Sequence, residues 1–444
     1  MLESRPYTVQ RRDFLSLLGA SAPVLFADPT APDRWSGLLR TLERAAGTTP
    51  SQLAGDEAFW TQVRSAYVTD PKLIDLDNAN VAPTPAPVIE AFVRRIHKLR
   101  RAPSISSGDM YADESSAIVR PRLAALLGTT PEELGLLRNA TDALNTVLRG
   151  FPLSRGDEII VTSHEYPDMV EIALQRARRE GIVVRTVRTA EPSEHPEALV
   201  DRISAAASPR TKLLLLSHVS AWSGEILPVK AACAEARRRG IATILDAAQS
   251  VGILDVSMKD IGCDFLAASL HKWLAAPIGT GVLAMRAEWR DRVEPLVPSA
   301  VGWEHPMGRF EWTGTALEAG WASAAEALDF HERLGLGRKR SRIGTLAAHW
   351  QDQISRIDRV RILTPRDQGR SFGVASIAIE GVPADKLAMH LLLDRGINVQ
   401  AKIGRHSPFT NAVRVSPGVY TTRGELDRFV AAIADVADRG LPAR

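Results

Sequence analysis

The feature that most constrains the fold is an alternation of short apolar segments with amphipathic ones in the middle of the chain. Residues 158–163, 211–217, 242–246 and 264–268 have the length of buried strands, while residues 168–180 and 229–239 have the spacing of helices. Apolar strands joined by helices are typical of a mainly parallel sheet covered on both faces. The pattern therefore predicts an α/β fold, in which ligands bind at the carboxyl ends of the strands.

The length of the chain, its prolines and a change in its composition indicate several structural units. A chain of 444 residues is long enough for two to three domains. Pro83, Pro85 and Pro87 mark an extended segment before a helix predicted at residues 88–98. A change of composition predicts one long helix at residues 321–336, leading into a smaller domain. We expect an N-terminal segment at 28–75, a large domain at 76–320 and a small C-terminal domain at 321–444.

Charge and cysteine content exclude several classes of protein. Lys and Arg number 55 against 52 Asp and Glu, and a net charge of +3 does not predict a nucleic-acid partner. Cys233 and Cys263 cannot form a disulfide framework, and no spacing of histidines and cysteines predicts a metal site. No apolar run reaches the roughly 18 residues of a membrane span, so we expect no stable membrane anchor. Basic runs at 94–101 and 338–342 are expected on solvated helix faces.

The first 27 residues have the pattern of an export signal. Arg11 and Arg12 precede Phe14 and Leu15, and a run of apolar and small residues follows to Phe26. A positive patch before such a run is typical of a secretory signal, and paired arginines are typical of the twin-arginine route for folded proteins. We expect residues 1–27 to be a signal peptide and the protein to be periplasmic. The alternative is a docked N-terminal helix in a cytoplasmic protein.

Chemically distinctive residues follow two of the predicted strands. Asp246 ends one strand and Gln249 comes three residues later, while Lys272 lies in the segment 269–273 that follows the next strand. A lysine can form an imine with a carbonyl cofactor and later act as a base. A nearby buried carboxylate favours the protonated form of a heterocyclic nitrogen. This pair predicts a site for a cofactor with a carbonyl group and a ring nitrogen.

Two further strand ends supply what such a cofactor needs. Thr141 lies at the start of a helix predicted at 143–148, and the free amides of a helix start bind phosphate. Tyr166 follows the strand at 158–163 and can stack on a flat ring. An imine lysine, an acid for the ring nitrogen, a phosphate site and a stacking aromatic together predict pyridoxal phosphate.

The chain resembles the class V aminotransferase family of fold-type-I pyridoxal-phosphate enzymes, in particular its isopenicillin-N-epimerase-like branch. The matching segments occur in the order of the family, and their combination is far more specific than any one of them. They are 76–80, 138–145, 163–166, 217–220 with Gly224 and Pro228, 246–249, 269–273, 312–315 and 413–417. The resemblance implies a large domain with a mainly parallel seven-stranded sheet and a smaller α+β C-terminal domain.

The resemblance also implies roles for single residues around the cofactor. Lys272 would carry the imine, Asp246 would pair with the pyridine nitrogen and Gln249 would bond the ring hydroxyl. Tyr166 would stack on the ring. The phosphate would be held by a set of small and polar residues, namely Ala140, Thr141, Ser269 and His271, together with Thr315 of a neighbouring subunit. The last contact implies a homodimer.

Substrate contacts are implied in the same way. Arg414 would bind the substrate carboxylate, and Asn80 is a second candidate for substrate binding. The alternative for Arg414 is an ion pair with an acid across the domains. His218 is a candidate catalytic residue, and the alternative is a histidine satisfied within the core.

Two departures from the family bear on the reaction. The cysteine desulfurases of this family carry a catalytic cysteine shortly before the carboxylate-binding arginine, and residues 404–411 contain none. Ala316 and Leu317 stand where the epimerase-like branch commonly has Arg-Asp. Desulfuration through a protein persulfide is therefore not expected, and the substrate of the epimerases does not transfer directly.

We expect an enzyme that abstracts the Cα proton of an amino acid or amino-acid-like group, with Lys272 moving the proton. Epimerisation would need an acid opposite Lys272, for which His218, Tyr111 and Glu165 are candidates, although Glu165 is expected in a turn or at the surface. Alternatives are a carbon–sulfur (β-elimination) lyase or a transaminase, with periplasmic tailoring of a peptide or siderophore side chain as one setting. An alternative of another class is a cofactor-free binding protein on the same fold.

Overall fold

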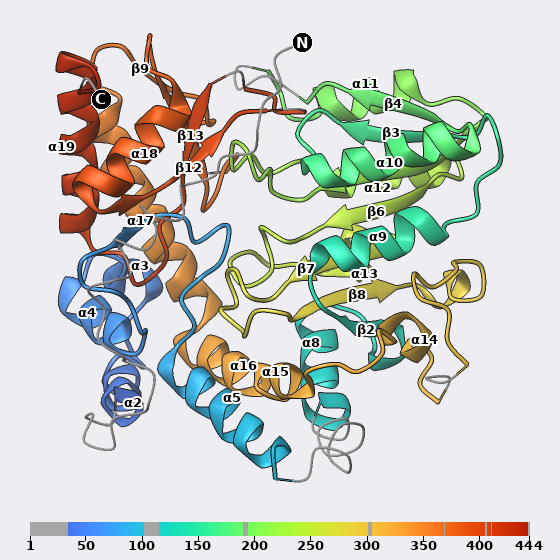
Figure 1. Ribbon diagram of the computed structural model, residues 1–444, viewed down its shortest axis with the longest axis horizontal. Helices are drawn as coiled ribbons and strands as arrows, with labels where there is room; N and C mark the ends of the chain where they lie inside the picture. The colour runs from blue at the N-terminus through green and yellow to red at the C-terminus, as the bar shows by residue number, and fades with distance from the viewer. Residues whose placement is uncertain are drawn as a thin grey trace.

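The structure is a computed structural model that describes residues 34–101, 115–189, 194–300, 304–367, 369–404, 406–409 and 411–442. The export signal predicted at 1–27 and the candidate Tyr111 lie outside the described residues. The central sheet has seven strands in the order β2-β8-β7-β6-β5-β3-β4 (Figure 1). These are β2 (Leu134–Leu137), β3 (Glu158–Thr162), β4 (Val183–Val187), β5 (Thr211–Ser217), β6 (Ala242–Asp246), β7 (Phe265–Ser269) and β8 (Gly281–Met285).

Strand direction and side-chain alternation explain the architecture of this sheet. Strands β4, β3, β5, β6 and β7 run parallel to one another, and β8 runs antiparallel to both β7 and β2. Ile159 and Val161 point into one buried cluster and Ile160 points into another, as the two-residue period of a strand requires. Because both faces are buried, the strands are apolar throughout, and the predicted mainly parallel α/β fold is confirmed.

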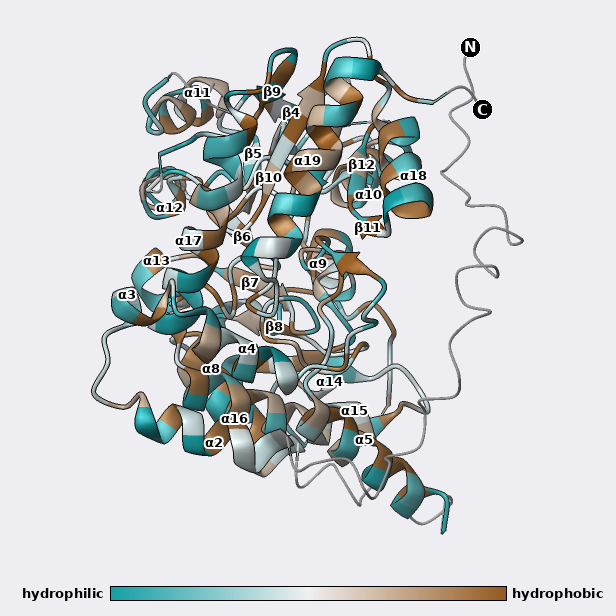
Figure 2. Cartoon of the chain, turned by 90° about the vertical axis from the view of Figure 1, so that its left-hand side faces the viewer, coloured by the Kyte–Doolittle hydropathy of each residue, from teal (hydrophilic) through white to brown (hydrophobic). Residues whose placement is uncertain are grey.

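Helices cover both faces of the sheet. One face packs against α9 (Ala140–Gly150) and α10 (Pro167–Glu180). The other packs against α8 (Arg120–Leu126), α11 (Ala198–Ala206) and α12 (Val229–Arg238). In Figure 2 the helices alternate hydrophobic and hydrophilic stretches, the pattern of amphipathic helices. Shorter elements are α13 (Met258–Ile261), α14 (Gly308–Glu311), η1 (Ser115–Val119), η2 (Pro131–Glu133) and η3 (Ala287–Trp289).

A second sheet lies in the C-terminal part of the chain. It has four strands in the order β12-β13-β10-β9, with β9 (Val360–Ile362), β10 (Ala375–Ile379), β12 (Gln400–Lys402) and β13 (Ala412–Val415). It shares a core with α17 (Leu336–Ile354), α18 (Ala384–Arg395) and α19 (Arg423–Arg439). We call this sheet and these three helices the C-terminal lobe. The domain boundaries drawn from the sequence stay a prediction.

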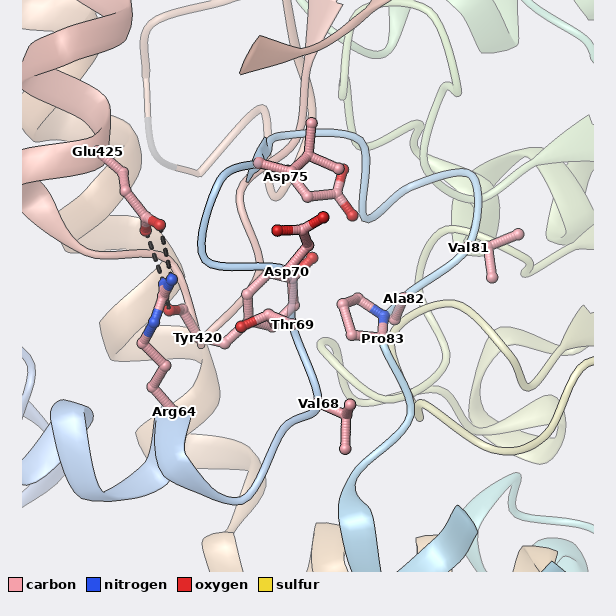
Figure 3. Close-up of a pocket in the computed structure, with 11 residues that line it drawn as sticks. Arg64, Val68, Thr69, Asp70, Asp75, Val81, Ala82, Pro83, Tyr420 and Glu425 are labelled. Carbon is pink, nitrogen blue, oxygen red and sulfur yellow. Dashed lines mark hydrogen bonds and ion pairs between the residues drawn. The ribbon is translucent and has the colours of Figure 1, made fainter. Parts of the chain in front are cut away.

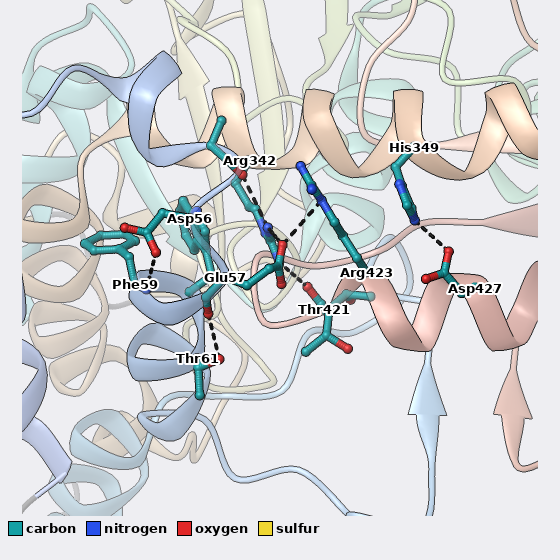
Figure 4. A network of polar contacts seen from close by, with 12 residues as sticks. Asp56, Glu57, Phe59, Thr61, Arg342, His349, Thr421, Arg423 and Asp427 are labelled. Atoms are coloured by element: carbon teal, nitrogen blue, oxygen red, sulfur yellow. Dashed lines mark hydrogen bonds and ion pairs between the residues drawn. The ribbon is translucent and has the colours of Figure 1, made fainter.

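The chain crosses to the C-terminal lobe before it builds the large sheet. Strand β1 (Ile74–Asp75) pairs in parallel with β11 (Ile397–Asn398), and Asp77 forms a bridge with Ser416. The helix that follows, α5 (Ala86–Leu99), begins directly after Pro85. Of the N-terminal helices, α3 (Pro50–Leu53) and α4 (Glu57–Ser65) lie beside α17 and α19, and α2 (Arg34–Arg44) packs against α4 and α5 (Figures 1 and 4).

The prediction of one long helix at 321–336 is wrong. The structure has α15 (Glu318–Ala322), α16 (Ala324–Leu334) and the start of α17 at Leu336 instead. Gly335 separates the last two with φ = +84°, a left-handed conformation that glycine adopts without a steric penalty. The sequence pattern extends through this break because both helices present apolar faces to the core.

The basic run at 338–342 is not a solvated helix face. Lys339 is 5% exposed and Arg342 is fully buried. Arg342 Nη1 lies 2.5 Å from Glu57 Oε1 and its Nη2 donates to the carbonyl of Thr421 at 2.9 Å (Figure 4). Buried cations require such partners, and these contacts fasten α4 to α17 and to the turn before α19.

No helix among the described residues is long and apolar enough to cross a membrane.

Candidate active site

A cavity of about 180 Å³ lies where the parallel strands of the large sheet end. Asp246 is the last residue of β6, Ser269 is the last of β7, and α9 begins at Ala140. The cavity brings together ten of the residues predicted for the site, namely Asn80, Ala140, Thr141, Tyr166, Asp246, Gln249, Ser269, His271, Lys272 and Arg414. The predicted roles of these residues stay predictions, but all ten residues line the same cavity.

The second cavity, of about 310 Å³, lies next to the first and shares Val81 with it (Figure 3). Its walls carry Asp70 and Asp75, and also the ion pair between Arg64 and Glu425 at 2.7 Å. None of the predicted site residues lines it. The candidate active site is therefore the smaller cavity, and the name active-site cavity is used for it below.

Asp246 and Lys272 have the electrostatics of a reactive pair. Asp246 is 8% exposed, and its Oδ1 accepts a hydrogen bond from the amide of Ala248 at 2.9 Å. Burial raises the pKa of Asp246, whereas that amide and the charge of Lys272 oppose the rise. Burial lowers the pKa of Lys272 to about 8, with Asp246 opposing the change. Lys272 therefore has a neutral, nucleophilic amine at a lower pH than an ordinary lysine.

Two hydrogen bonds fix the orientation of Gln249. Its Nε2 donates to the carbonyl of Ala79 at 2.9 Å, and its Oε1 accepts from Trp273 Nε1 at 2.9 Å. An amide nitrogen carries two hydrogens, so one N–H of Gln249 is left for a ligand in the cavity. This arrangement fits the predicted bond to a ring hydroxyl. Trp273 is adjacent to Lys272 in the chain, so its hydrogen bond to Gln249 joins the two residues predicted to contact the cofactor.

The start of α9 forms the opposite end of the cavity. Asn139 caps the helix by accepting from the amide of Asp142 at 2.8 Å, and the amide of Ala140 donates to Ser269 Oγ at 2.9 Å. Gly281 on β8 makes this approach possible, because a Cβ there would lie 2.3 Å from the Cα of Asn139. A helix start beside two hydroxyl side chains, those of Thr141 and Ser269, fits a phosphate group.

Arg414 combines both interpretations offered for it. It is 3% exposed, and its Nη2 donates to Asp77 Oδ1 at 2.7 Å while its Nη1 donates to the carbonyl of Ala221 at 3.2 Å. It also lines the active-site cavity. A guanidinium has five N–H donors, so the two contacts leave three for a carboxylate. The ion pair with Asp77 thus holds Arg414 in place without using up its donors.

Two predicted residues lie outside the cavity. Thr315 is exposed in the loop between α14 and α15, and its role in a neighbouring subunit stays a prediction. His218 is 8% exposed and is not among the residues that line the cavity, and burial lowers its pKa to about 4. Because the buried Nδ1 of His218 has no hydrogen-bond partner among the described residues, this is not the satisfied core histidine of the alternative, and its role stays a prediction.

Glu165 lies in the turn after β3, as one of the two expectations had it, but it is buried and not at the surface. It is 1% exposed and accepts hydrogen bonds from Thr162 Oγ1 at 2.6 Å and from the amide and Oγ of Ser217 at 3.0 and 2.7 Å. The reason is that Glu165 joins the ends of β3 and β5, whose last polar groups it satisfies. Burial raises its pKa to about 7, although these hydrogen bonds act against the rise. Glu165 does not line the cavity, so it is not placed to reach a substrate.

Sequence reasoning missed two residues of the site, Gln400 and Lys402. Both line the cavity from β12, which pairs with β13 so that Gln400 lies opposite Arg414. Residues two apart on a strand share a face, so Lys402 faces the cavity with Gln400, while Ala401 packs against the core of the C-terminal lobe. The two-residue spacing of Gln400 and Lys402 is visible in the sequence, but the pairing of their strand with the strand of Arg414 is not.

No group of three or more histidine, cysteine, aspartate or glutamate side chains that could hold a metal ion occurs in the part of the chain that the structure describes.

Comparisons with known proteins identify the family of the chain. The sequence profile of the family described as Aminotransferase class-V matches residues 74–429. The isopenicillin N epimerase of Streptomyces clavuligerus is 32% identical, over 85% of this chain and 98% of the relative. A probable cysteine desulfurase of Xylella fastidiosa is 29% identical, over 85% of this chain and 95% of the relative. The solved apo structure of the cysteine desulfurase from Thermococcus onnurineus has a TM-score of 0.73 and 26% identity, over 83% of this chain and 96% of that one.

The fold and the site define a pyridoxal-phosphate-dependent enzyme of fold type I. The chain belongs to the class V aminotransferase family. The residues present fit this cofactor: Lys272 would hold its carbonyl carbon, Asp246 its ring nitrogen, Gln249 its ring hydroxyl and the start of α9 its phosphate. The alternative of a cofactor-free binding protein does not explain a buried lysine beside a buried carboxylate.

Proposed function

We propose that this enzyme removes the Cα proton of an amino acid, in the manner of an epimerase. The observation that carries the proposal is the pair formed by Lys272 and Asp246, in which burial lowers the pKa of the lysine to about 8. An amine with such a pKa is a suitable general base near neutral pH. Similarity to isopenicillin N epimerases over 85% of the chain supports the same proposal.

Each residue of the cavity has a separate role in the proposed reaction. Pyridoxal phosphate, when bound, withdraws electrons from the bonds at the Cα of an amino acid. Arg414 would orient the substrate through its carboxylate, and Asn80 lies on the same wall. Lys272 would accept the Cα proton, and Asp246 would keep the ring nitrogen protonated throughout. Tyr166, which is 40% exposed and lines the cavity, would cover one face of the ring.

The two cysteines do not support a desulfurase that uses a protein persulfide. Cys233 and Cys263 are both buried in the core below the sheet, and neither lines the cavity. Burial raises the pKa of Cys233 to about 11, so its thiol is unreactive near neutral pH. A carbon–sulfur lyase that eliminates a group from Cβ needs no such cysteine, and it is the second candidate because several relatives are named as cysteine desulfurases.

The experiment is Cα hydrogen exchange in deuterium oxide with a panel of amino acids. We expect deuterium to enter at Cα, with loss of chirality for the preferred substrate. Release of a thiol or a keto acid without loss of chirality would favour the lyase or a transaminase. Absence of exchange with every amino acid tested would refute the proposal.

We also propose that the enzyme is an exported homodimer. Supporting the dimer, Thr315 lies on an exposed loop away from its own cavity, which is the position required of a residue that serves a neighbouring subunit. Supporting export, the Arg11-Arg12 pair precedes an apolar run, and the chain has too few cysteines to depend on oxidative folding. Sedimentation of the active enzyme tests the first proposal. Fractionation of cells that carry Arg11→Lys together with Arg12→Lys tests the second, because the uncleaved protein should accumulate inside.

A further inference from the structure

Lys402 is a buried lysine for which the proposed reaction provides no role. It is 8% exposed, lines the active-site cavity and has no hydrogen bond or ion pair among the described residues. Its Nζ lies over the ring of Trp222, 5.1 Å from the ring centroid. A buried charge is costly unless it is paired, and a single aromatic contact offsets only a part of that cost.

The surroundings of Lys402 add positive charge. Burial lowers its pKa well below the ordinary value, the charges of Arg414 and Lys272 lower it further, and Asp77 opposes them. Asp77 is already paired with Arg414 at 2.7 Å. An anion that enters the cavity beside Lys402 would remove this repulsion and restore the charge of the lysine.

The sheet register separates Lys402 from the carboxylate contact of the proposed mechanism. Gln400 lies directly opposite Arg414, and Lys402 is two residues further along β12 on the same face. Such a diagonal pair is separated by about 7–8 Å between backbone positions. Lys402 and Arg414 therefore reach the cavity from two different positions on one sheet face, and each brings its own N–H donors for a carboxylate.

We propose that Lys402 binds a carboxylate on the side chain of the substrate, so that the enzyme selects amino acids with two carboxylates. This inference rests on the proposed function, since it assigns the α-carboxylate to Arg414 and the Cα proton to Lys272. It makes Lys402 a specificity-determining residue of the same cavity.

Calorimetric titration of the holoenzyme with glutarate and with pentanoate tests the proposal. These acids have chains of the same length and carry two carboxylates and one, and neither has an amine that could react with the cofactor. We expect glutarate to bind about 10- to 100-fold more tightly than pentanoate, the range for a hydrogen bond to a charged group. Lys402→Met should abolish the difference and leave pentanoate binding within about twofold of wild type.

Lys386→Met is the matched control, because Lys386 is exposed on α18 of the same lobe and its loss changes the net charge equally. It should keep the preference for glutarate. A thermal melt checks the folding of each variant, and Lys402→Gln replaces Lys402→Met if the latter does not fold.

Three results would overturn the proposal. They are equal affinity of the wild type for the two acids, a preference for glutarate that survives the substitution of Lys402, and an equal loss of affinity for both acids in that variant. The last would place Lys402 at the α-carboxylate instead. Failure of the proposed function is distinguishable, because Cα hydrogen exchange with norvaline, which has one carboxylate, does not require Lys402. A preference for glutarate without any exchange would refute the proposed function and leave the second anion site standing.

Discussion

Substitution of Gly281 by alanine should displace the helix start that forms the phosphate end of the cavity. A Cβ at position 281 would lie 2.3 Å from the Cα of Asn139 and 2.6 Å from its N and C. Ordinary contacts between carbon atoms are about 3.5–4.0 Å, so the two backbones must move apart by about 1 Å or more. The displaced atoms belong to backbone, and neither side can turn away as a flexible side chain would.

The magnitude follows from overpacking and from one lost contact. Extra atoms in a packed site cost about 1–3 kcal/mol, and a backbone clash lies toward the upper end of that range. For a domain of this size about 2–3 kcal/mol lowers the melting temperature by about 4 to 12 °C. The movement would also break the hydrogen bond from the amide of Ala140 to Ser269 Oγ, now 2.9 Å long. We expect cofactor affinity to fall by about tenfold or more, which corresponds to 1.4 kcal/mol.

The assay is a thermal melt of the apoprotein followed by equilibrium dialysis of the cofactor. Gly320→Ala is the control, because a Cβ there meets only Thr280 at 3.8 Å and Phe92 at 4.0 Å, which are ordinary contacts. This variant should bind cofactor normally and melt at the wild-type temperature or slightly above it, since alanine favours the helix. If Gly281→Ala melts and binds cofactor like the control, the close approach of β8 and α9 does not hold the site together.

Three further predictions concern the same cavity and its support. Lys272→Ala should abolish covalent capture of the cofactor. For the wild-type apoprotein, the rate of capture should rise with pH and level off above about 8, because the lowered pKa yields the neutral amine there. A rate that keeps rising to about pH 10.4, the ordinary pKa of lysine, would contradict the lowered pKa. Asp246→Ala should still capture cofactor on Lys272 but should slow Cα hydrogen exchange by about 10²-fold or more, since removal of one charge-stabilising group costs that much; near-normal exchange would refute the role of Asp246. Glu57→Gln should destabilise the protein by about 1–3 kcal/mol in a denaturant titration, because the fully buried Arg342 loses its counter-charge and one of two acceptor oxygens, while the Glu57 side chain is 39% exposed. An unchanged midpoint would show that this ion pair does not fasten α4 to α17.

The sequence predicted the large sheet well because burial on both faces leaves a local signature. Strands β5 and β6 were placed at 211–217 and 242–246 with the ends that the structure has. Their carboxyl ends carry Ser217 and Asp246, and a parallel sheet brings such ends together whatever the intervening helices do. Lys272 and Gln249 could be assigned to the cavity for the same reason.

The misses arise from contacts between parts distant in sequence. Arg342 reads as a surface residue until Glu57, 285 residues away, is placed beside it. Glu165 lies in a turn, but its burial could not be predicted because its partner Ser217 lies on another strand. The spacing of Gln400 and Lys402 indicates a shared face, but only the pairing of β12 with β13 places that face at the cavity. Local pattern predicts which elements form, whereas tertiary pairing decides which polar residues are buried.

The crossing of the chain into the C-terminal lobe has a consequence for how the enzyme can close on a substrate. The amides of Ile74, Leu76 and Asn78 donate to the carbonyls of Gly396, Asn398 and Ser416, at 2.8, 3.0 and 3.0 Å. These bonds make the segment that carries Asp77 a part of the lobe rather than of the large sheet. A rotation of the lobe would therefore carry Asp77 and Arg414 together as one rigid body, while Lys272 stays with β7. Such a rotation would leave the ion pair between Arg414 and Asp77 unchanged, whereas the hydrogen bond from Arg414 to the carbonyl of Ala221, which lies after β5, would lengthen or break.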